Sequence, residues 1–169
     1  MQMETNNKII EKLLEYRNYH IIERDDTKFI AQNNEKFLIV VFSLYPTLNI
    51  DGIKEYLNIL NTLDFSHMII IYNKSITSSS KKIIQHVKVQ GIKIEAFQSD
   101  KLVDISAHRL FRPHEKITGD EEEEIRKKYG SKLPKILTSD AMVLWYGFEK
   151  GDILKITRKD GHITYRLVA

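Results

Sequence analysis

Cysteine is absent from this 169-residue sequence, and long apolar runs are absent with it. The lack of cysteine excludes disulfide bonds and thiolate metal sites. The longest apolar runs, at residues 37–42 and 68–71, are far shorter than the roughly 18 residues that a membrane-spanning helix needs. The first residues also lack the order of charged, apolar and small side chains that marks a signal peptide. We therefore expect an intracellular protein that has no membrane partner.

Glycine is scarce, and its seven occurrences are scattered over expected turns and helix ends. The phosphate-binding glycine motifs of nucleotide-binding folds are therefore missing. The G-x-S-x-G turn of serine hydrolases is missing as well. These absences argue against nucleotide-dependent enzymes and serine hydrolases.

The sequence has no large excess of positive or negative side chains, since the formal net charge is only +3 at pH 7. Residues 1–100 carry 12 basic and 12 acidic side chains, and residues 101–169 carry 14 and 11. A protein that binds nucleic acid unaided usually concentrates positive charge on one face. Any nucleic-acid contact of this chain is therefore expected to be local and assisted by a partner.

Six histidines raise the question of a metal site. His108 and His114 stand on either side of Pro113, and Glu115 follows the second histidine. A zinc site needs three or four convergent ligands, and no regular element of the sequence supplies them. We expect hydrogen-bonded structural histidines, with no metal or other cofactor.

A nuclease is the catalytic alternative that we weighed, because Asp25, Asp26 and Glu35 precede the first buried strand. A metal-dependent nuclease places carboxylates on adjacent strands to hold Mg²⁺ and a water. The apolar strands expected at residues 37–42 and 68–72 carry no acid. A free-standing nucleic-acid-binding protein with a nuclease-like but inactive domain stays open as an alternative.

The first hundred residues alternate amphipathic helices with continuous apolar strands. The expected elements are helices after Thr5, after Asp51 and from Thr77 to Gly91, with strands at residues 37–42, 68–72 and 92–97. Strands that are apolar throughout are typical of a sheet with both faces covered. Residues 1–97 are therefore expected to form a three-layer-like α/β domain.

A different pattern begins near Asp100, and residues 98–169 are expected to form a second, smaller α+β domain. The signals for its helices are a Thr118–Glu121 capping box with Gly130 behind it, and a cap at Ser139 or Asp140 with Gly147 behind a shorter helix. Apolar residues then alternate with polar ones on both sides of Asp160-Gly161. That dipeptide favours a type I′ turn, so the domain is expected to end in a β-hairpin.

Hydroxyl and lysine side chains gather where the third helix of the first domain is expected to begin. Thr77, Ser78, Ser79, Lys81 and Lys82 surround this start. A helix N-terminus offers unpaired amides and a positive dipole, a combination that suits a phosphate. The alternative is an ordinary capped surface helix.

The second domain resembles the small shared (fifth-largest) subunit of eukaryotic RNA polymerases I, II and III and its counterpart in archaeal RNA polymerase. The stretches that carry the resemblance are DISAHRLFRPHEKIT, LPKILTSDAMVLWYGFEKGDILKITR and TYRLV. The first 97 residues are similar, more loosely, to the additional N-terminal domain of eukaryotic and viral forms. The chain departs from the family pattern at Asp140-Ala141, where the family has Asp-Pro, and at residues 159–161, where its turn is shorter.

This resemblance implies a non-catalytic subunit of a multisubunit DNA-directed RNA polymerase, with no small-molecule substrate. Residues 98–169 would be the assembly domain, which docks on the largest subunit. Residues 1–97 would form part of the jaw around downstream double-stranded DNA. The residues expected to face DNA are Thr77, Ser78, Ser79, Lys81 and Lys82. Those expected at the subunit interface are His108, Pro113, His114, Trp145, Tyr146, Arg158, Tyr165 and Arg166. The expected location is the nucleus for a cellular protein, and host cytoplasm or virion for a viral one.

Overall fold

The computed structural model describes residues 2–34 and 36–169. It divides into two compact units, Met1–Val103 and Asp104–Ala169. The predicted boundary between residues 97 and 98 falls inside strand β7 (Lys93–Gln98). Each unit mixes helices and strands and has its own sheet, so the prediction of a mixed α+β fold is confirmed. Within the described part of the chain, no helix has the length and apolar character to cross a membrane.

The N-terminal unit is built on a five-stranded sheet in the order β1-β2-β3-β5-β7. Its elements are α1 (Gln2–Tyr16), β1 (His20–Arg24), β2 (Lys28–Asn33), β3 (Lys36–Phe42), β4 (Thr47–Leu48), α2 (Ile50–Leu63), β5 (His67–Tyr72), β6 (Ser75–Ile76), α3 (Ser78–Val89) and β7. Strand β2 runs antiparallel to both β1 and β3, whereas β3, β5 and β7 are parallel. The predicted strands at residues 37–42, 68–72 and 92–97 correspond to β3, β5 and β7.

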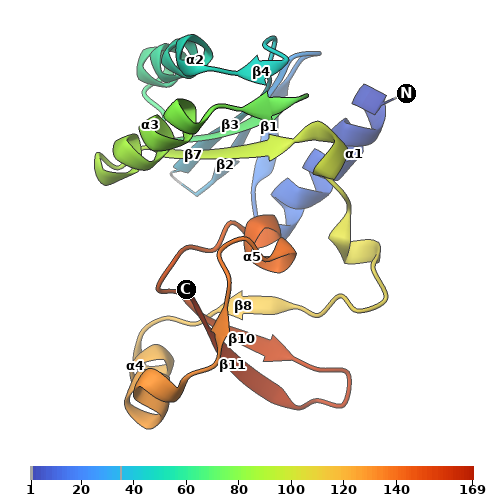
Figure 1. Cartoon of the computed structure of the whole chain (residues 1–169). Coiled ribbons are helices and arrows are strands. Elements are labelled where there is room, and N and C mark those ends of the chain that lie inside the picture. Colours follow the sequence, from blue (N-terminus) through green and yellow to red (C-terminus); the bar gives the residue numbers. More distant parts are fainter. Residues whose placement is uncertain (1, 35) are drawn as a thin grey trace. The chain divides into compact units, whose positions relative to one another are not determined.

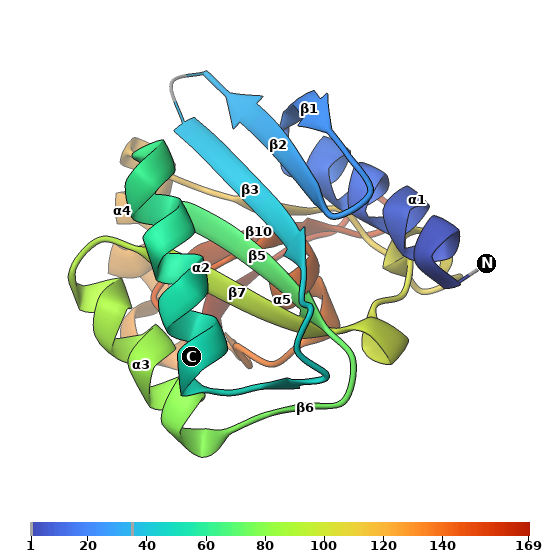
Figure 2. The same ribbon diagram turned by 90° about the horizontal axis from the view of Figure 1, so that it is seen from above.

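Helices cover both faces of this sheet, which explains why β3 and β5 are apolar after their first residues, Lys36 and His67 (Figures 1 and 2). On one face, Ile53 and Leu60 of α2 pack in a cluster with Ile39 and Ile70. Ile69, the neighbour of Ile70 on β5, points to the opposite face and is buried as well. Helix α1 lies at that second face. Arg17, the residue after the helix, donates a hydrogen bond there to Glu95 of β7.

The structure differs from the sequence-based expectations for this unit in three places. The hairpin of β1 and β2 was not predicted, because every residue of β1 is exposed and the strand has no buried apolar face. Helix α1 begins at Gln2, so Thr5 lies inside the helix instead of capping it. Asn49, and not Asp51, caps α2, since its side chain accepts a hydrogen bond from the Gly52 amide at 2.9 Å. The predicted Thr77 cap of α3 is confirmed.

The C-terminal unit has a four-stranded sheet in the order β8-β10-β11-β9. Its elements are the short 3-10 helix η2 (Ile105–Ala107), β8 (His114–Lys116), α4 (Asp120–Tyr129), η3 (Gly130–Lys132), β9 (Lys135–Ile136), α5 (Ala141–Tyr146), β10 (Ile153–Thr157) and β11 (Ile163–Val168). Strand β10 pairs antiparallel with both β8 and β11, and β9 runs parallel to β11.

Alternation along β10 gives the sheet two buried faces. Ile153 packs with Ile125 of α4, whereas Leu154 packs with Val143 of α5. Helices α4 and α5 therefore lie on different faces of the sheet (Figure 1). Each face carries its own helix, so only the part of a face that its helix leaves uncovered is open to a partner.

Two turn predictions fail in this unit, while the α5 prediction succeeds. Gly119, and not Thr118, is the N-cap residue of α4, with a φ of 64° and no side-chain cap, so Thr118 and Glu121 form no capping box. The β10–β11 connection is a three-residue loop, because Arg158 and His162 are still paired and only Gly161 has a positive φ, of 79°. A type I′ turn would require positive φ at Asp160 as well. Asp140 caps α5 and Gly147 ends it, as predicted.

Candidate functional sites

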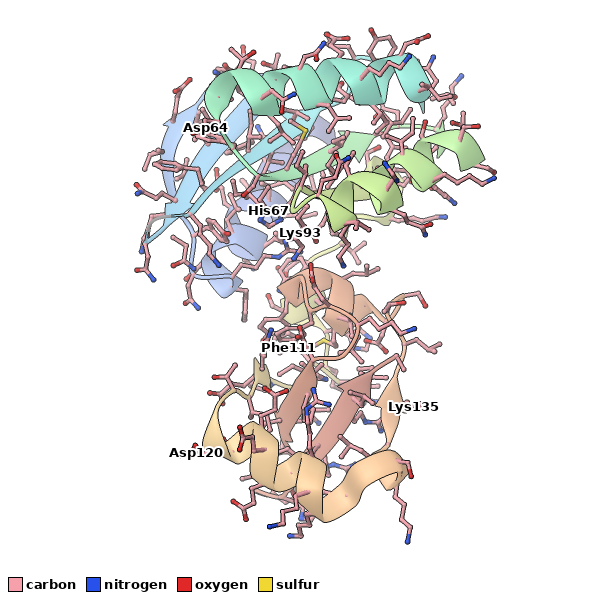
Figure 3. The ribbon with its side chains drawn as sticks, turned by 90° about the vertical axis from the view of Figure 1, so that its left-hand side faces the viewer. Asp64, His67, Lys93, Phe111, Asp120 and Lys135 are labelled. Carbon is pink, nitrogen blue, oxygen red and sulfur yellow. The ribbon has the colours of Figure 1, made fainter. Side chains whose placement is uncertain are left out.

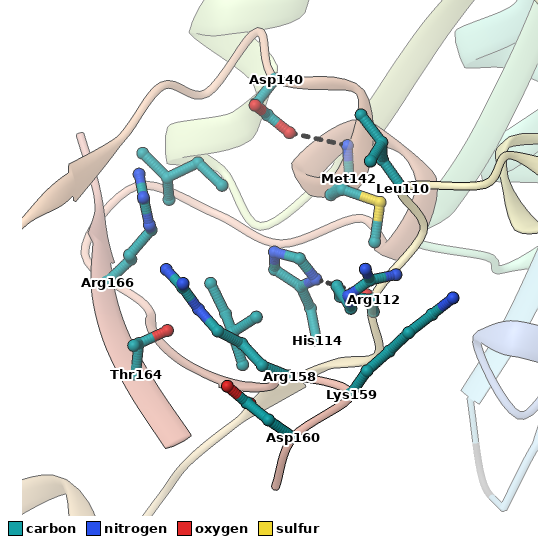
Figure 4. A pocket seen from close by; sticks show the side chains of 12 residues that line it. Leu110, Arg112, His114, Asp140, Met142, Arg158, Lys159, Asp160, Thr164 and Arg166 are labelled. Atoms are coloured by element: carbon teal, nitrogen blue, oxygen red, sulfur yellow. Dashed lines mark hydrogen bonds between the residues drawn. The ribbon is translucent and has the colours of Figure 1, made fainter. Parts of the chain in front are cut away.

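A pocket of about 590 Å³ opens in the C-terminal unit, on the α5 face of the sheet (Figure 4). Its apolar lining consists of Leu110, Ile136, Met142 and Ile156. Its basic lining and histidine are Arg112, His114, Arg158, Lys159 and Arg166. Asp140, Asp160 and Thr164 complete the wall. Three residues predicted from the sequence as interface residues, His114, Arg158 and Arg166, thus meet in one cavity.

Strand register brings these three residues together from distant parts of the chain. Ile156 of β10 pairs with His114 of β8 on one side and with Thr164 of β11 on the other. Side chains two positions apart on a strand share a face. Arg158 therefore lies on the face of Ile156, and Arg166 lies on the face of Thr164. The β10–β11 hairpin therefore places both arginines at the pocket.

The positive charges of the pocket exceed its negative charges, and the two acids already have backbone partners. Asp140 accepts a hydrogen bond from the Met142 amide at 2.8 Å as the α5 cap. Asp160 accepts one from the His162 amide at 3.0 Å in the hairpin loop. Among the described residues, no ion pair joins either acid to Arg158 or Arg166, and Arg166 makes only a long 3.4 Å bond to the Lys135 carbonyl. The guanidinium groups of Arg158 and Arg166 are thus not neutralised by the acids of the pocket.

His114 lines the same pocket, and one of its ring nitrogens is already used. Its Nδ1 donates to the Arg112 carbonyl at 2.8 Å. Burial lowers the pKa of the His114 imidazole below its usual value, and the charge of Arg166 acts in the same direction. The bond to the Arg112 carbonyl and the charge of Asp140 act against that shift. The lowered pKa favours the neutral ring, in which Nδ1 carries the proton and the Nε2 atom is left as an acceptor.

The other predicted interface residues do not line this cavity, although Tyr146 lies beside it, with its ring centroid 6.4 Å from that of His114. Trp145 is only 3% exposed and belongs to the core of the unit. Tyr146 stacks on Phe148, with ring centroids 5.1 Å apart. Tyr165 points to the opposite face, where its hydroxyl donates to Glu121 of α4 at 3.1 Å. His108 and Pro113 are exposed in the segment before β8. Sequence reasoning missed Arg112, Lys159 and Met142, since only the fold brings together the segment before β8, the hairpin loop and α5.

The start of α3 in the N-terminal unit is the second candidate site. The Thr77 hydroxyl accepts a hydrogen bond from the Ser80 amide at 3.2 Å, and the two hydroxyl oxygens lie 2.8 Å apart. Ser80 itself is fully buried. Of the five side chains predicted to face a phosphate at this helix end, Thr77 is half-buried as the cap, and the other four are exposed: Ser78, Ser79, Lys81 and Lys82.

A second helix begins beside this one. Strands β4 and β6 pair in parallel with Leu48 opposite Ile76, and each leads directly into a helix. The caps Asn49 and Thr77 are therefore neighbours, and two positive helix ends lie together. The first turn of α2 carries Asp51, whereas the first turn of α3 carries no acid. The α3 end is the one whose surroundings favour an anion.

The sequence of the C-terminal unit matches a family of polymerase subunits. Residues 103–168 match the family model described as RNA polymerase Rpb5, C-terminal domain. A subunit of RNA polymerases IV and V from Arabidopsis thaliana, 5B, is 30% identical over 66% of this chain and 54% of its own length. The rpabc1 subunit of RNA polymerases I, II and III from Dictyostelium discoideum is 30% identical over 77% of this chain and 71% of its own length. The chain belongs to the Rpb5 family of RNA polymerase subunits.

A viral relative matches along nearly the whole chain. This putative DNA-directed RNA polymerase subunit of Invertebrate iridescent virus 6 is 29% identical over 95% of this chain and 96% of its own length. The chain spans about half of the Arabidopsis relative, at 54%. The Rpb5 segment at residues 103–168 contains every residue that lines the pocket, whereas the start of α3 lies outside it.

Membership of the Rpb5 family does not favour the nuclease-like alternative, and the local geometry gives the acids other roles. Asp25 accepts hydrogen bonds from the amides of Thr27 and Lys28 at 2.7 and 2.9 Å, in the turn between β1 and β2. Glu35 lies outside the described residues. Across residues 2–34 and 36–169, no three acids or histidines cluster in a way that suits a metal ion.

Proposed function

We propose that this Rpb5-family chain is a non-catalytic subunit of a multisubunit DNA-directed RNA polymerase. Its C-terminal unit docks on the largest subunit, and its N-terminal unit forms part of the jaw around downstream DNA. Nucleotide chemistry belongs to the large subunits. The protein is found wherever that polymerase works: the nucleus for a cellular enzyme, or host cytoplasm and virion for a viral one.

The observation that carries the docking role is the convergence of His114, Arg158 and Arg166 in one pocket. They belong to three separate segments, and all three lie within the Rpb5-matched region. Arginine is enriched among the residues that anchor protein interfaces, particularly where it fits a preformed site. An exposed cavity with unpaired arginines supports binding to a partner chain.

The jaw role rests on the start of α3. Lys81 and Lys82 add positive charge to a helix N-terminus that has no acid in its first turn. Contacts of this kind bind phosphates and carry no sequence information. Because the net charge of the chain is only +3, the rest of the polymerase supplies most of the attraction for DNA.

Purification of the tagged chain from its native host tests this proposal. The two large polymerase subunits are expected to be recovered in stoichiometric amounts and identified by mass spectrometry. An Arg158→Glu/Arg166→Glu variant is expected to lose them. Lys127→Glu/Lys132→Glu is the matched control, because it makes the same charge change at exposed positions near α4. Recovery of the chain alone, with DNA affinity of its own, would contradict the proposal and favour a free-standing DNA-binding protein.

A further inference from the structure

The docking pocket is selective in its chemistry, because its walls combine unpaired cations with an apolar floor. Arg158 and Arg166 are exposed, and neither forms an ion pair with any residue that the structure describes. Figure 4 shows both side chains directed into the pocket from the hairpin. A guanidinium that lacks an internal partner is a ready donor for a planar, two-oxygen acceptor.

The floor between these arginines is apolar and stays partly open. Ile136 and Ile156 are each 8% exposed, and Met142 is half-buried beside them. Met142 belongs to the first turn of α5, which the Asp140 cap fixes in place. The pocket volume of about 590 Å³ is within the roughly 300–1,000 Å³ that is usual for ligand pockets. The floor therefore offers an aliphatic side chain a place to be buried.

The two acids of the pocket make a single carboxylate a better ligand than a nucleic-acid chain. Asp140 and Asp160 lie in the wall, among the cations. A polyanion would bring successive phosphates against these carboxylates and be repelled. A single carboxylate can approach Arg158 and Arg166 and leave the acids on either side of it. The arrangement thus favours a protein segment with one acidic side chain over a phosphate backbone.

We infer that the pocket binds an acidic segment of the largest polymerase subunit, in which a carboxylate contacts Arg158 and Arg166 and an adjacent aliphatic side chain covers Ile156. This inference rests on the proposed docking role and adds the chemistry of the docked segment. Neither arginine belongs to the core of the unit, so substituting it leaves the fold intact and tests recognition directly.

Overlapping short peptides that cover the largest subunit of the same polymerase are the probe. The full-length tagged chain is incubated with them on an array. The bound peptides are expected to contain an Asp or Glu next to an aliphatic residue. Replacing that acid by its amide is expected to weaken binding by about tenfold or more, because a charged hydrogen bond is lost. Arg158→Gln and Arg166→Gln are expected to do the same, whereas Lys127→Gln does not.

A charge exchange gives the decisive control. The Arg166→Glu variant is expected to lose binding of the acidic peptide. It is expected to bind a version of that peptide in which Lys replaces the acidic residue. Binding of neutral or basic peptides by the unmodified chain, or equal binding of acid and amide peptides, would overturn the inference. Displacement of the acidic peptide by an oligothymidylate at equal concentration would overturn it too, since the pocket would then prefer phosphates.

These experiments distinguish failure of the docking role from failure of the inference about the carboxylate. If pocket variants lose the polymerase in cells but bound peptides are not acidic, docking stands and the inference about the carboxylate fails. If acidic peptides bind through Arg158 and Arg166 while the variants still recover the polymerase, the pocket chemistry stands. In that case another surface of the C-terminal unit supports assembly.

Discussion

The guanidinium of Arg17 donates two hydrogen bonds to the carboxylate of Glu95, at 2.8 and 2.9 Å. The two residues are 78 positions apart, and their bond joins the end of α1 to β7. Both side chains are largely buried, at 3% and 14% exposure. His67 of β5 lies 2.8 Å from the same carboxylate through its Nε2 atom. Figure 3 shows His67 next to Lys93, its register partner on β7.

Substituting Arg17 is expected to loosen α1 from the sheet. Arg17→Met leaves the buried Glu95 carboxylate without its main counter-charge, and loss of one partner of a buried pair costs about 3–5 kcal/mol. Arg24→Met is the control, because the Arg24–Glu11 pair is exposed and such pairs contribute less than about 1 kcal/mol. Urea-dependent hydrogen exchange of the amides in α1 and β7 measures both losses. Equal protection in the two variants would show that the buried pair has no special role.

Acid is expected to destabilise the N-terminal unit in two steps. Burial holds the pKa of His67 below its usual value of 6.5, against the effect of Glu95. Burial would raise the pKa of Glu95, but the charge of Arg17 and the hydrogen bonds from His67 and Arg17 outweigh it, so this pKa lies well below 4.5. Both folded-state values are depressed, so the unfolded chain binds more protons as the pH falls. Stability is therefore lost below pH 6.5 through His67, and further below pH 4.5 through Glu95.

His67→Gln is expected to remove the first of these steps and to leave the second. Hydrogen exchange of β5 and β7, compared with the wild-type chain at each pH, is a suitable readout because the single tryptophan, Trp145, lies in the other unit. An unchanged response between pH 7 and 5 would assign the first step to another group.

Tyr165 and Arg166 are adjacent in sequence but are expected to differ in their mutational effects. The Tyr165 hydroxyl binds Glu121 on the α4 face, and Glu121 also accepts from Lys155 Nζ at 3.0 Å. Tyr165→Phe is expected to lower stability slightly, because one solvent-screened hydrogen bond is lost, and to keep polymerase association. Arg166→Gln is expected to keep stability and to weaken association. Urea unfolding and recovery of the large subunits measure the two effects, and a reversed pattern would place the partner on the α4 face.

Local signals predicted those elements whose ends are determined by nearby residues. Helix α5 is the clearest case, because Asp140 caps its start and Gly147 ends it with a φ of 71°. The Thr77 cap of α3 was predictable for the same reason. In both cases the groups that form the bond lie within a few positions of each other.

Long-range contacts account for the failures. Glu121 has the spacing of a capping residue, but it binds Lys155 and Tyr165, which are 34 and 44 positions away. The ion pair of Arg17 and Glu95 leaves no pattern in the sequence, since neither residue is marked by its neighbours. The pocket was only partly predictable: resemblance to the family pointed to His114, Arg158 and Arg166, but the register of three strands was needed to bring them together.

Lysines at the two ends of α3 are expected to contribute differently to DNA binding. Lys81 and Lys82 lie in the first turns of α3, whereas Lys88 lies in its last turn. If the start of α3 faces phosphates within the assembled polymerase, Lys81→Gln and Lys82→Gln each remove about one phosphate contact. The slope of log affinity against log salt then falls by roughly 0.9 for each. Lys88→Gln, with the same charge change on the same helix, is expected to leave the slope unchanged.

Salt titrations of a downstream duplex bound to polymerase that contains each variant measure the slopes. Identical slopes for Lys82→Gln and Lys88→Gln would remove the start of α3 from the DNA path.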